Sequence, residues 1–173
     1  MRIKDLDQSD ELKNFLLDFA NNLQGFLLLS GKNGTGKSTA AMAVYEFVSP
    51  FKLPAYDHDI AYFANQADLN FHWQKEFNDY GTALGILKVV TETKLLILDD
   101  LGTRIPSDSF MDFLYKIADE RYLNRHSRAT IITTNLNMTD MRQKFGDAFV
   151  SRVASGQCFR LEGNDRRFEY DKF

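Results

Sequence analysis

Eight consecutive residues constrain the fold of this chain more than any others. They read Gly31-Lys32-Asn33-Gly34-Thr35-Gly36-Lys37-Ser38 and fit the pattern G-x-x-x-x-G-K-[ST] at each fixed position. The apolar stretch Phe26–Ser30 precedes them, and the helix-forming stretch Lys37–Val48 follows. Glycines let a backbone wrap around a phosphate with its N–H groups inward, and the next helix adds the positive end of its dipole. This context predicts a phosphate-binding loop and makes a chance glycine-rich turn the weaker interpretation.

Two side chains of this loop carry chemistry. In loops of this pattern the lysine, here Lys37, brings a positive charge to the β- and γ-phosphates of a nucleotide, and the hydroxyl residue, here Ser38, is a ligand of Mg²⁺. The residues expected to bind the nucleotide are Gly31, Asn33, Gly34, Thr35, Gly36, Lys37, Ser38 and Thr39.

Short apolar runs alternate with helix-length segments along the 173 residues, which is the length of one domain. The expected strands are Phe26–Ser30, Ile60–Ala64, Leu95–Asp99, Ala129–Thr134 and Gln157–Leu161. The expected helices are Lys37–Val48, Gln66–Asn78, Ser107–Asn124, Thr139–Phe145 and Asp147–Ala154. Continuously apolar strands such as FLLLS and LLILD are typical of a parallel sheet that is covered on both faces. The pattern predicts a three-layer α/β domain.

A second signal lies where an apolar strand ends in two carboxylates, Asp99 and Asp100. The carboxyl ends of parallel strands meet at one edge of a sheet, which is also the edge of the phosphate loop. We expect Asp99 to hold Mg²⁺ and Asp100 to orient or activate a water against the γ-phosphate. Asn135 follows another strand, and its amide can donate and accept between Asp100 and that phosphate. The alternatives are a loop that merely begins with two acids and, for Asn135, a helix cap.

Nine of the ten arginines lie after residue 100, although the net charge of the chain is −3. Arg152, near the end of a short helix, is the candidate for an arginine that reaches the γ-phosphate of a neighbouring subunit. A solvated helix face is the alternative for Arg152. Arg166 and Arg167 suit contacts with nucleotide, DNA or solvent.

Composition excludes several classes of protein. One cysteine, Cys158, rules out an internal disulfide framework and a multi-cysteine zinc site, and the three histidines lack metal-ligand spacing. The acidic N-terminus has no signal-peptide core, and no apolar run approaches the ~20 residues that cross a bilayer. We therefore expect a cytoplasmic protein without a membrane partner.

Three further groups of residues have competing interpretations. The stripe of Leu12, Phe15, Leu16, Phe19 and Leu23 is expected to pack on the domain's own sheet, with a partner-binding helix as the alternative. One group combines aromatic rings with a cation and suits stacking on single-stranded DNA, with core packing as the alternative: Phe71, Trp73, Lys75, Phe77 and Tyr80. The other group is basic and suits single-stranded DNA by its charge, with favourable electrostatics at a helix C-terminus as the alternative: Arg121, Arg125, His126 and Arg128.

Five segments, in their order along the chain, resemble the AAA+ ATPases of the DnaC/DnaI helicase-loader and IstB transposition-helper group. They read GKNGTGKST, LLILDDLG, IITTN, FGDAFVSRV and LEGNDRRF. The resemblance covers about residues 25–169. It implies a P-loop NTPase sheet in the order 5-1-4-3-2, ATP with Mg²⁺, and assembly into a ring or spiral. It implies that Arg152 is an arginine finger acting in trans and that Arg167 is a second-sensor arginine acting in cis. AAA+ proteins usually have Glu at the position of Asp100, although members of this group often have Asp-Asp at the positions of Asp99 and Asp100.

The resemblance also implies a domain organisation and a function. Residues 1–173 are expected to form a single AAA+ core, with an N-terminal helix in 1–24, no separate helicase-binding domain and a minimal or absent lid. The expected function is ATP hydrolysis, weak alone and stimulated by assembly or DNA, in a protein that places a replicative helicase on single-stranded DNA. The alternatives are a transposition helper that binds duplex DNA, a small-molecule kinase, and a non-catalytic binding module.

Overall fold

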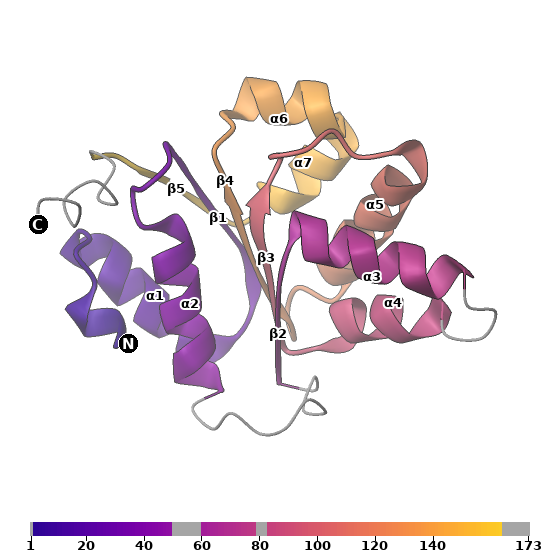
Figure 1. Cartoon of the computed structure of the whole chain (residues 1–173). Coiled ribbons are helices and arrows are strands. Elements are labelled where there is room, and N and C mark those ends of the chain that lie inside the picture. Colours follow the sequence, from indigo (N-terminus) through magenta and orange to yellow (C-terminus); the bar gives the residue numbers. More distant parts are fainter. Residues whose placement is uncertain (1, 50–59, 79–82, 164–173) are drawn as a thin grey trace, which may run out of the picture.

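Five parallel strands form one sheet in the order β2-β3-β4-β1-β5 (Figure 1). The computed structural model describes residues 2–49, 60–78 and 83–163. The strands are β1 (Gly25–Gly31), β2 (Ala61–Asn65), β3 (Leu95–Leu101), β4 (Ala129–Thr134) and β5 (Gln157–Leu161). Their order is the expected 5-1-4-3-2 read from the other edge, so the predicted sheet is confirmed.

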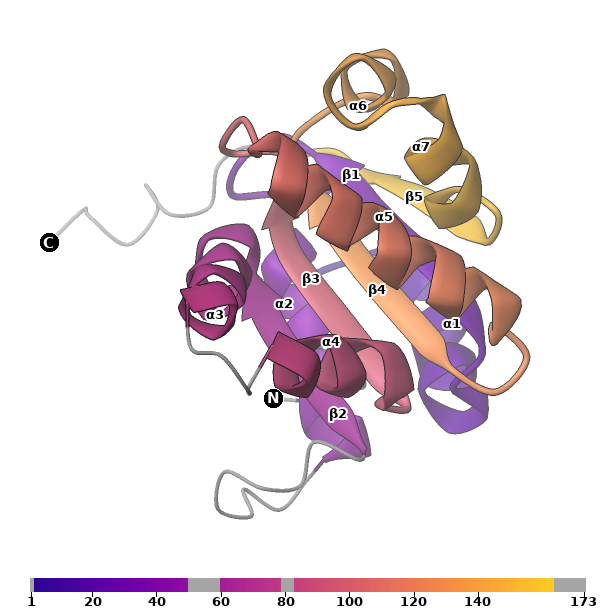
Figure 2. The same cartoon turned by 90° about the vertical axis from the view of Figure 1, so that its right-hand side faces the viewer.

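Helices cover both faces of this sheet, so the three-layer α/β fold is confirmed (Figures 1 and 2). One face carries the short 3-10 turn η1 (Ile3–Asp5), α1 (Asp10–Asn22) and α2 (Lys37–Val48). The other face carries α3 (Gln66–Asn78), α4 (Ala83–Glu92), α5 (Asp108–Leu123), α6 (Met138–Phe145) and α7 (Asp147–Val153). None of the described helices is long and apolar enough to cross a membrane.

The central strands explain why their sequences are apolar without alternation. Leu27 and Leu29 of β1 pack under α1 and α2, whereas Leu28 between them packs toward α5 and α7. Successive side chains of a strand point to opposite faces, and here both faces are covered. Every residue of β4 is buried.

The N-terminal helix α1 packs on its own domain, as expected. Ser9 caps it by accepting a hydrogen bond from the backbone N–H of Leu12. Leu12, Leu16 and Phe19 are each at most 6% exposed and belong to the core above β1. Phe15 and Leu23 are partly buried and pack against the same core, so the stripe serves the domain's own packing.

The helix α4 has no counterpart among the expected elements. Its sequence ALGILKVVTE contains three β-branched residues in a row, which have modest helix propensity. Ile86 and Val90 pack into the core beside α3 and α5, so tertiary burial stabilises this helix.

Candidate nucleotide-binding and hydrolysis site

A cleft of about 570 Å³ opens at the carboxyl edge of the sheet, within the range of small-ligand sites. It brings together the N-terminal segment, the phosphate loop with the start of α2, and the ends of β3 and β4. Its lining residues are Asp5, Leu6, Asp7, Gln8, Asn33, Gly34, Gly36, Lys37, Ser38, Thr39, Asp99, Asp100, Thr103 and Asn135. Most residues that the sequence predicts for the site thus line one cavity. Gly31 and Thr35 belong to the same loop but lie on its other side, beside Leu161.

The phosphate loop is shaped by glycine and by its own hydrogen bonds. Gly36 has a φ of 91° and begins α2 without a side-chain cap, so the first turn of the helix directs N–H groups toward the cleft. Gly31 has a φ of 147°, and a Cβ there would lie 2.3 Å from the carbonyl oxygen of Leu161. The buried Thr35 hydroxyl donates to the carbonyl oxygen of Lys32 at 2.9 Å. The donors of the loop are therefore already arranged for an anion.

Lys37 places its ammonium group inside this loop. The residue is only 6% exposed, and its Nζ donates to the carbonyl oxygens of Gly31 at 2.9 Å and Lys32 at 2.7 Å. A cation beside a helix N-terminus favours a polyanionic ligand such as a nucleoside triphosphate.

Thr133 connects the two acidic residues that face the loop. Its Oγ1 donates to Oδ1 of Asp99 at 2.6 Å and accepts the backbone N–H of Asp100 at 2.9 Å. A hydroxyl has one proton, so Thr133 donates to Asp99 and accepts from the backbone of Asp100. Asp100 has a φ of 56° and lies within a bulge of β3, between Leu98 and Leu101, and its side chain lines the cleft. Nδ2 of Asn135 donates to its Oδ1 at 3.3 Å.

Ser38 and Asp99 supply the oxygen donors that suit Mg²⁺. Mg²⁺ usually takes one or two carboxylates from the protein and completes its octahedron with phosphates and water. Within the described residues, no three or more His, Cys, Asp and Glu side chains are arranged so that they could hold a metal ion by themselves. A hydroxyl and a carboxylate lining the same cleft therefore fit an ion that is shared with bound phosphates.

Three polar residues that sequence reasoning missed help to build the cleft. Nε2 of Gln8 donates to the carbonyl oxygen of Thr35 at 2.9 Å and so ties the N-terminal segment to the phosphate loop. Gln66 holds the turn after β3, since its Oε1 accepts from Gly102 and its Nε2 donates to Arg104. No motif marks either glutamine, whereas Thr133 stands next to a strand end that the sequence did single out.

Arg152 lies away from the cleft, on the opposite face of the sheet from α1 and α2. Its Nε donates to Oδ1 of Asp119 on α5 at 2.7 Å, and its Nη1 donates to the carbonyl oxygen of Ala148 at 2.9 Å. Its guanidinium also lies 4.7 Å from the ring centre of Tyr115. The structure thus does not bring Arg152 to the cleft of its own chain. Arg167 lies outside the described residues.

Arg121 does not contribute to the predicted basic surface at the end of α5, because it is fully buried. In the same group His126 is exposed, and Arg125 and Arg128 are partly exposed. The guanidinium of Arg121 donates to four carbonyl oxygens and one hydroxyl, those of Val90, Thr91, Thr93, Ala129 and Thr130. Burial lowers the pKa of Arg121 to about 9, so the group remains a cation at neutral pH.

The predicted aromatic group on α3 is divided between core and surface. Trp73 stacks on Phe113 of α5 with ring centres 4.3 Å apart, so this ring serves packing. Phe71 is 63% exposed and Lys75 is exposed, and these two remain available to a ligand. The side chain of Phe77 and all of Tyr80 lie outside the described part of the chain.

Several of the solved structures similar to this one are replication proteins. The DnaC helicase loader matches with a TM-score of 0.74 and 23% identity, over 93% of this chain and 96% of that chain. DnaI matches with a TM-score of 0.72 and 18% identity, over 93% and 90%. The replication initiator DnaA, bound to AMPPCP and single-stranded DNA, matches with a TM-score of 0.78 and 16% identity, over 94% of this chain and 50% of that chain. At these identities the likeness concerns the fold.

The sheet, the phosphate loop and the acidic strand end together define a P-loop NTPase of the AAA+ class. The family model of the IstB-like ATP binding protein matches residues 3–154. The chain therefore belongs to the family of IstB-like ATP binding proteins, and its predicted place in the DnaC/DnaI and IstB group is confirmed. A search of curated proteins found no match.

Proposed function

We propose that this protein hydrolyses ATP to ADP and phosphate in the cleft between the phosphate loop and the acidic strand end. The observation that carries the proposal is the arrangement of Asp99, Asp100 and Asn135 around Thr133, across the cleft from Lys37. A binding module needs the loop and its lysine, but it does not need a carboxylate that is turned into the cleft and held by an amide.

The roles follow from position. The loop N–H groups and Lys37 hold the β- and γ-phosphates, and Ser38 and Asp99 hold Mg²⁺. The bound ion neutralises charge on the phosphate oxygens. Asp100 orients a water and accepts its proton as the water oxygen bonds to the γ-phosphorus and the bond from that phosphorus to the bridging oxygen breaks. Asn135 keeps Asp100 aimed at that water.

The arginine roles complete this proposal. Arg152 acts in trans on the γ-phosphate of a neighbouring subunit, within a ring or spiral of protomers, because its own cleft lies elsewhere. Arg167 reads the nucleotide in cis. Residues 1–173 act as one AAA+ core.

We further propose that the protein acts in DNA replication in the cytoplasm. It assembles on single-stranded DNA in an ATP-dependent way and helps to load a replicative helicase. The support is the fold shared with DnaC and DnaI over nearly the whole chain, and with DnaA bound to single-stranded DNA. The IstB description of the matching family favours a second candidate, a transposition helper acting on duplex DNA. A small-molecule kinase is disfavoured, because Asp100 and Asn135 suit water as the phosphoryl acceptor.

Three measurements test these proposals. Phosphate release from ATP without any added acceptor tests hydrolysis, with Lys37→Ala as the inactive control. Co-purification with the replicative helicase from the same source, with and without ATP, tests loading. Preference for duplex over single-stranded DNA at one fixed salt concentration, together with no helicase binding, would favour the transposition helper.

A further inference from the structure

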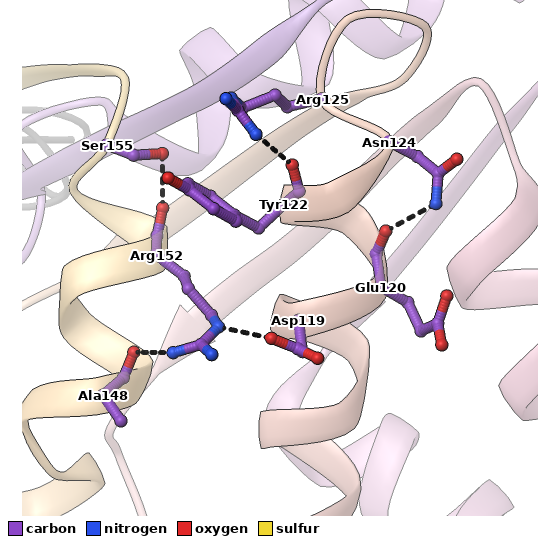
Figure 3. A network of polar contacts seen from close by, with 8 residues as sticks. All are labelled: Asp119, Glu120, Tyr122, Asn124, Arg125, Ala148, Arg152 and Ser155. Atoms are coloured by element: carbon purple, nitrogen blue, oxygen red, sulfur yellow. Dashed lines mark hydrogen bonds and ion pairs between the residues drawn. The ribbon is translucent and has the colours of Figure 1, made fainter.

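The guanidinium of Arg152 is held by three different groups where α7 packs against α5, and Figure 3 shows two of them, Asp119 and Ala148. Asp119 accepts from Nε at 2.7 Å, the carbonyl oxygen of Ala148 accepts from Nη1 at 2.9 Å, and the Tyr115 ring lies 4.7 Å from the guanidinium carbon. The two hydrogen bonds fix how the guanidinium is rotated within its own plane, and the Tyr115 ring fixes the orientation of that plane. A long side chain that usually samples many rotamers therefore has one orientation here.

These contacts leave one edge of the guanidinium unused. Within the described residues, Nη2 makes no hydrogen bond, and neither does the second hydrogen of Nη1. The side chains of Arg152 and Asp119 are 25% and 39% exposed, so this edge is accessible from outside the protomer. Two parallel N–H donors on an accessible edge match the oxygens of a phosphate.

We propose that Asp119 and Tyr115 are positioning residues that present this free edge of Arg152 to the γ-phosphate bound by a second copy of the chain. The proposal rests on the proposed function, which makes Arg152 an arginine finger in trans. A second copy is the occupant because Arg152 and its own cleft lie on different parts of the molecule. Asp119 adds no phosphate contact itself: it acts by orienting Arg152.

The expected cost of losing this support follows from the value of geometry in catalysis. An arginine finger is worth about 10³–10⁵-fold in rate, and a misplacement of about 1 Å in a catalytic group costs about 10²-fold. We therefore expect Asp119→Asn, which keeps the shape and removes the charge, to lower ATP hydrolysis by about 10²-fold. Tyr115→Leu should lower it less, and Tyr115→Phe, which keeps the ring, should not change it.

Mixing experiments distinguish positioning from a general structural defect. Asp100→Asn is expected to bind ATP without hydrolysing it and still carries an intact Arg152. Mixed with Asp119→Asn protein, it should restore hydrolysis in the clefts of the Asp119→Asn subunits. Mixing Asp119→Asn with Arg152→Ala should restore nothing, since neither supplies a well-placed arginine. Glu120→Gln removes the neighbouring, exposed carboxylate and is the matched control, with activity unchanged.

Each other outcome overturns the proposal. If Arg152→Ala is inactive but Asp119→Asn is fully active, positioning by Asp119 is wrong and the finger stands. If Arg152→Ala itself is fully active, the finger assignment in the proposed function fails first. If Asp119→Asn hydrolyses ATP faster than the unmodified protein, the contact is inhibitory. If no mixture restores the Asp119→Asn subunits, Asp119 has a merely structural role.

Discussion

At the scale of single residues, Thr133 organises the catalytic edge of the cleft. Its hydroxyl is fully buried, yet it contacts both Asp99 and the backbone of Asp100. It therefore sets where Asp99, the proposed Mg²⁺ ligand, and Asp100, the proposed base, lie relative to each other.

We expect Thr133→Val to keep ATP binding and to lower hydrolysis by about 10²-fold, because both acidic residues lose their common partner. Thr133→Ser keeps the hydroxyl and should stay within a few-fold of the unmodified protein. Nucleotide binding measured by calorimetry, beside phosphate release, checks the separation. Equal loss of binding and hydrolysis in Thr133→Val would instead indicate collapse of the cleft.

Asp100→Asn tests the proposed base directly. Asparagine tolerates the left-handed backbone at this position, where φ is 56°, so the fold should be unaffected. General-base catalysis contributes about 10²–10⁴-fold, and we expect hydrolysis to fall by that much while ATP still binds. Single-turnover phosphate release from pre-bound ATP is the measurement, and an unchanged rate would remove Asp100 from the mechanism.

The sequence predicts these residues unequally, for a physical reason. Lys37, Ser38 and Asp99 belong to local patterns that many chains share, so they are visible without a structure. Thr133 and Gln8 act through contacts with residues 34 and 27 positions away in the chain, and only the folded sheet brings those partners together.

At the scale of elements, α5 joins the parts of the face opposite α1 and α2. Arg121 extends from it to the carbonyl oxygens at the end of α4 and at the start of β4. Tyr115 and Asp119 of the same helix hold Arg152 of α7.

We expect Arg121→Met to destabilise the protein by about 3–5 kcal/mol, since several buried carbonyl groups lose their donor at once. Arg125→Met is the control. Arg125 donates to the carbonyl of Tyr122 near the surface, and its loss should cost less than about 1 kcal/mol. Urea unfolding of both variants gives the free energies, and equal values would contradict a structural role for Arg121.

The same element shows where the sequence misleads. Arg121, Arg125 and Arg128 stand close together in the chain and suggest one basic surface. Helical geometry turns Arg121 inward, and the turn after α5 directs Arg128 to the carbonyl oxygen of Thr91. The strands, in contrast, are predictable because burial on both faces demands continuous apolar runs.

At the scale of the whole molecule, the cleft and Arg152 occupy different faces of one domain. In the proposed function Arg152 acts on the nucleotide of a neighbouring subunit, so the hydrolysis site of a single protomer lacks its arginine. We therefore expect hydrolysis per subunit to rise with protein concentration in step with ATP-dependent assembly. Phosphate release measured beside sedimentation over a dilution series checks this expectation. A rate per subunit that is independent of concentration would show that each protomer is complete.

One contact described above also constrains how the molecule transmits signals. Gly31 approaches the carbonyl oxygen of Leu161 so closely that not even a methyl group fits between the phosphate loop and β5. A partner that pushes β5 toward the loop must therefore displace the loop as well. Coupling of this kind is reciprocal: if nucleotide changes the affinity of β5 for a partner by some factor, that partner changes the affinity for nucleotide by the same factor.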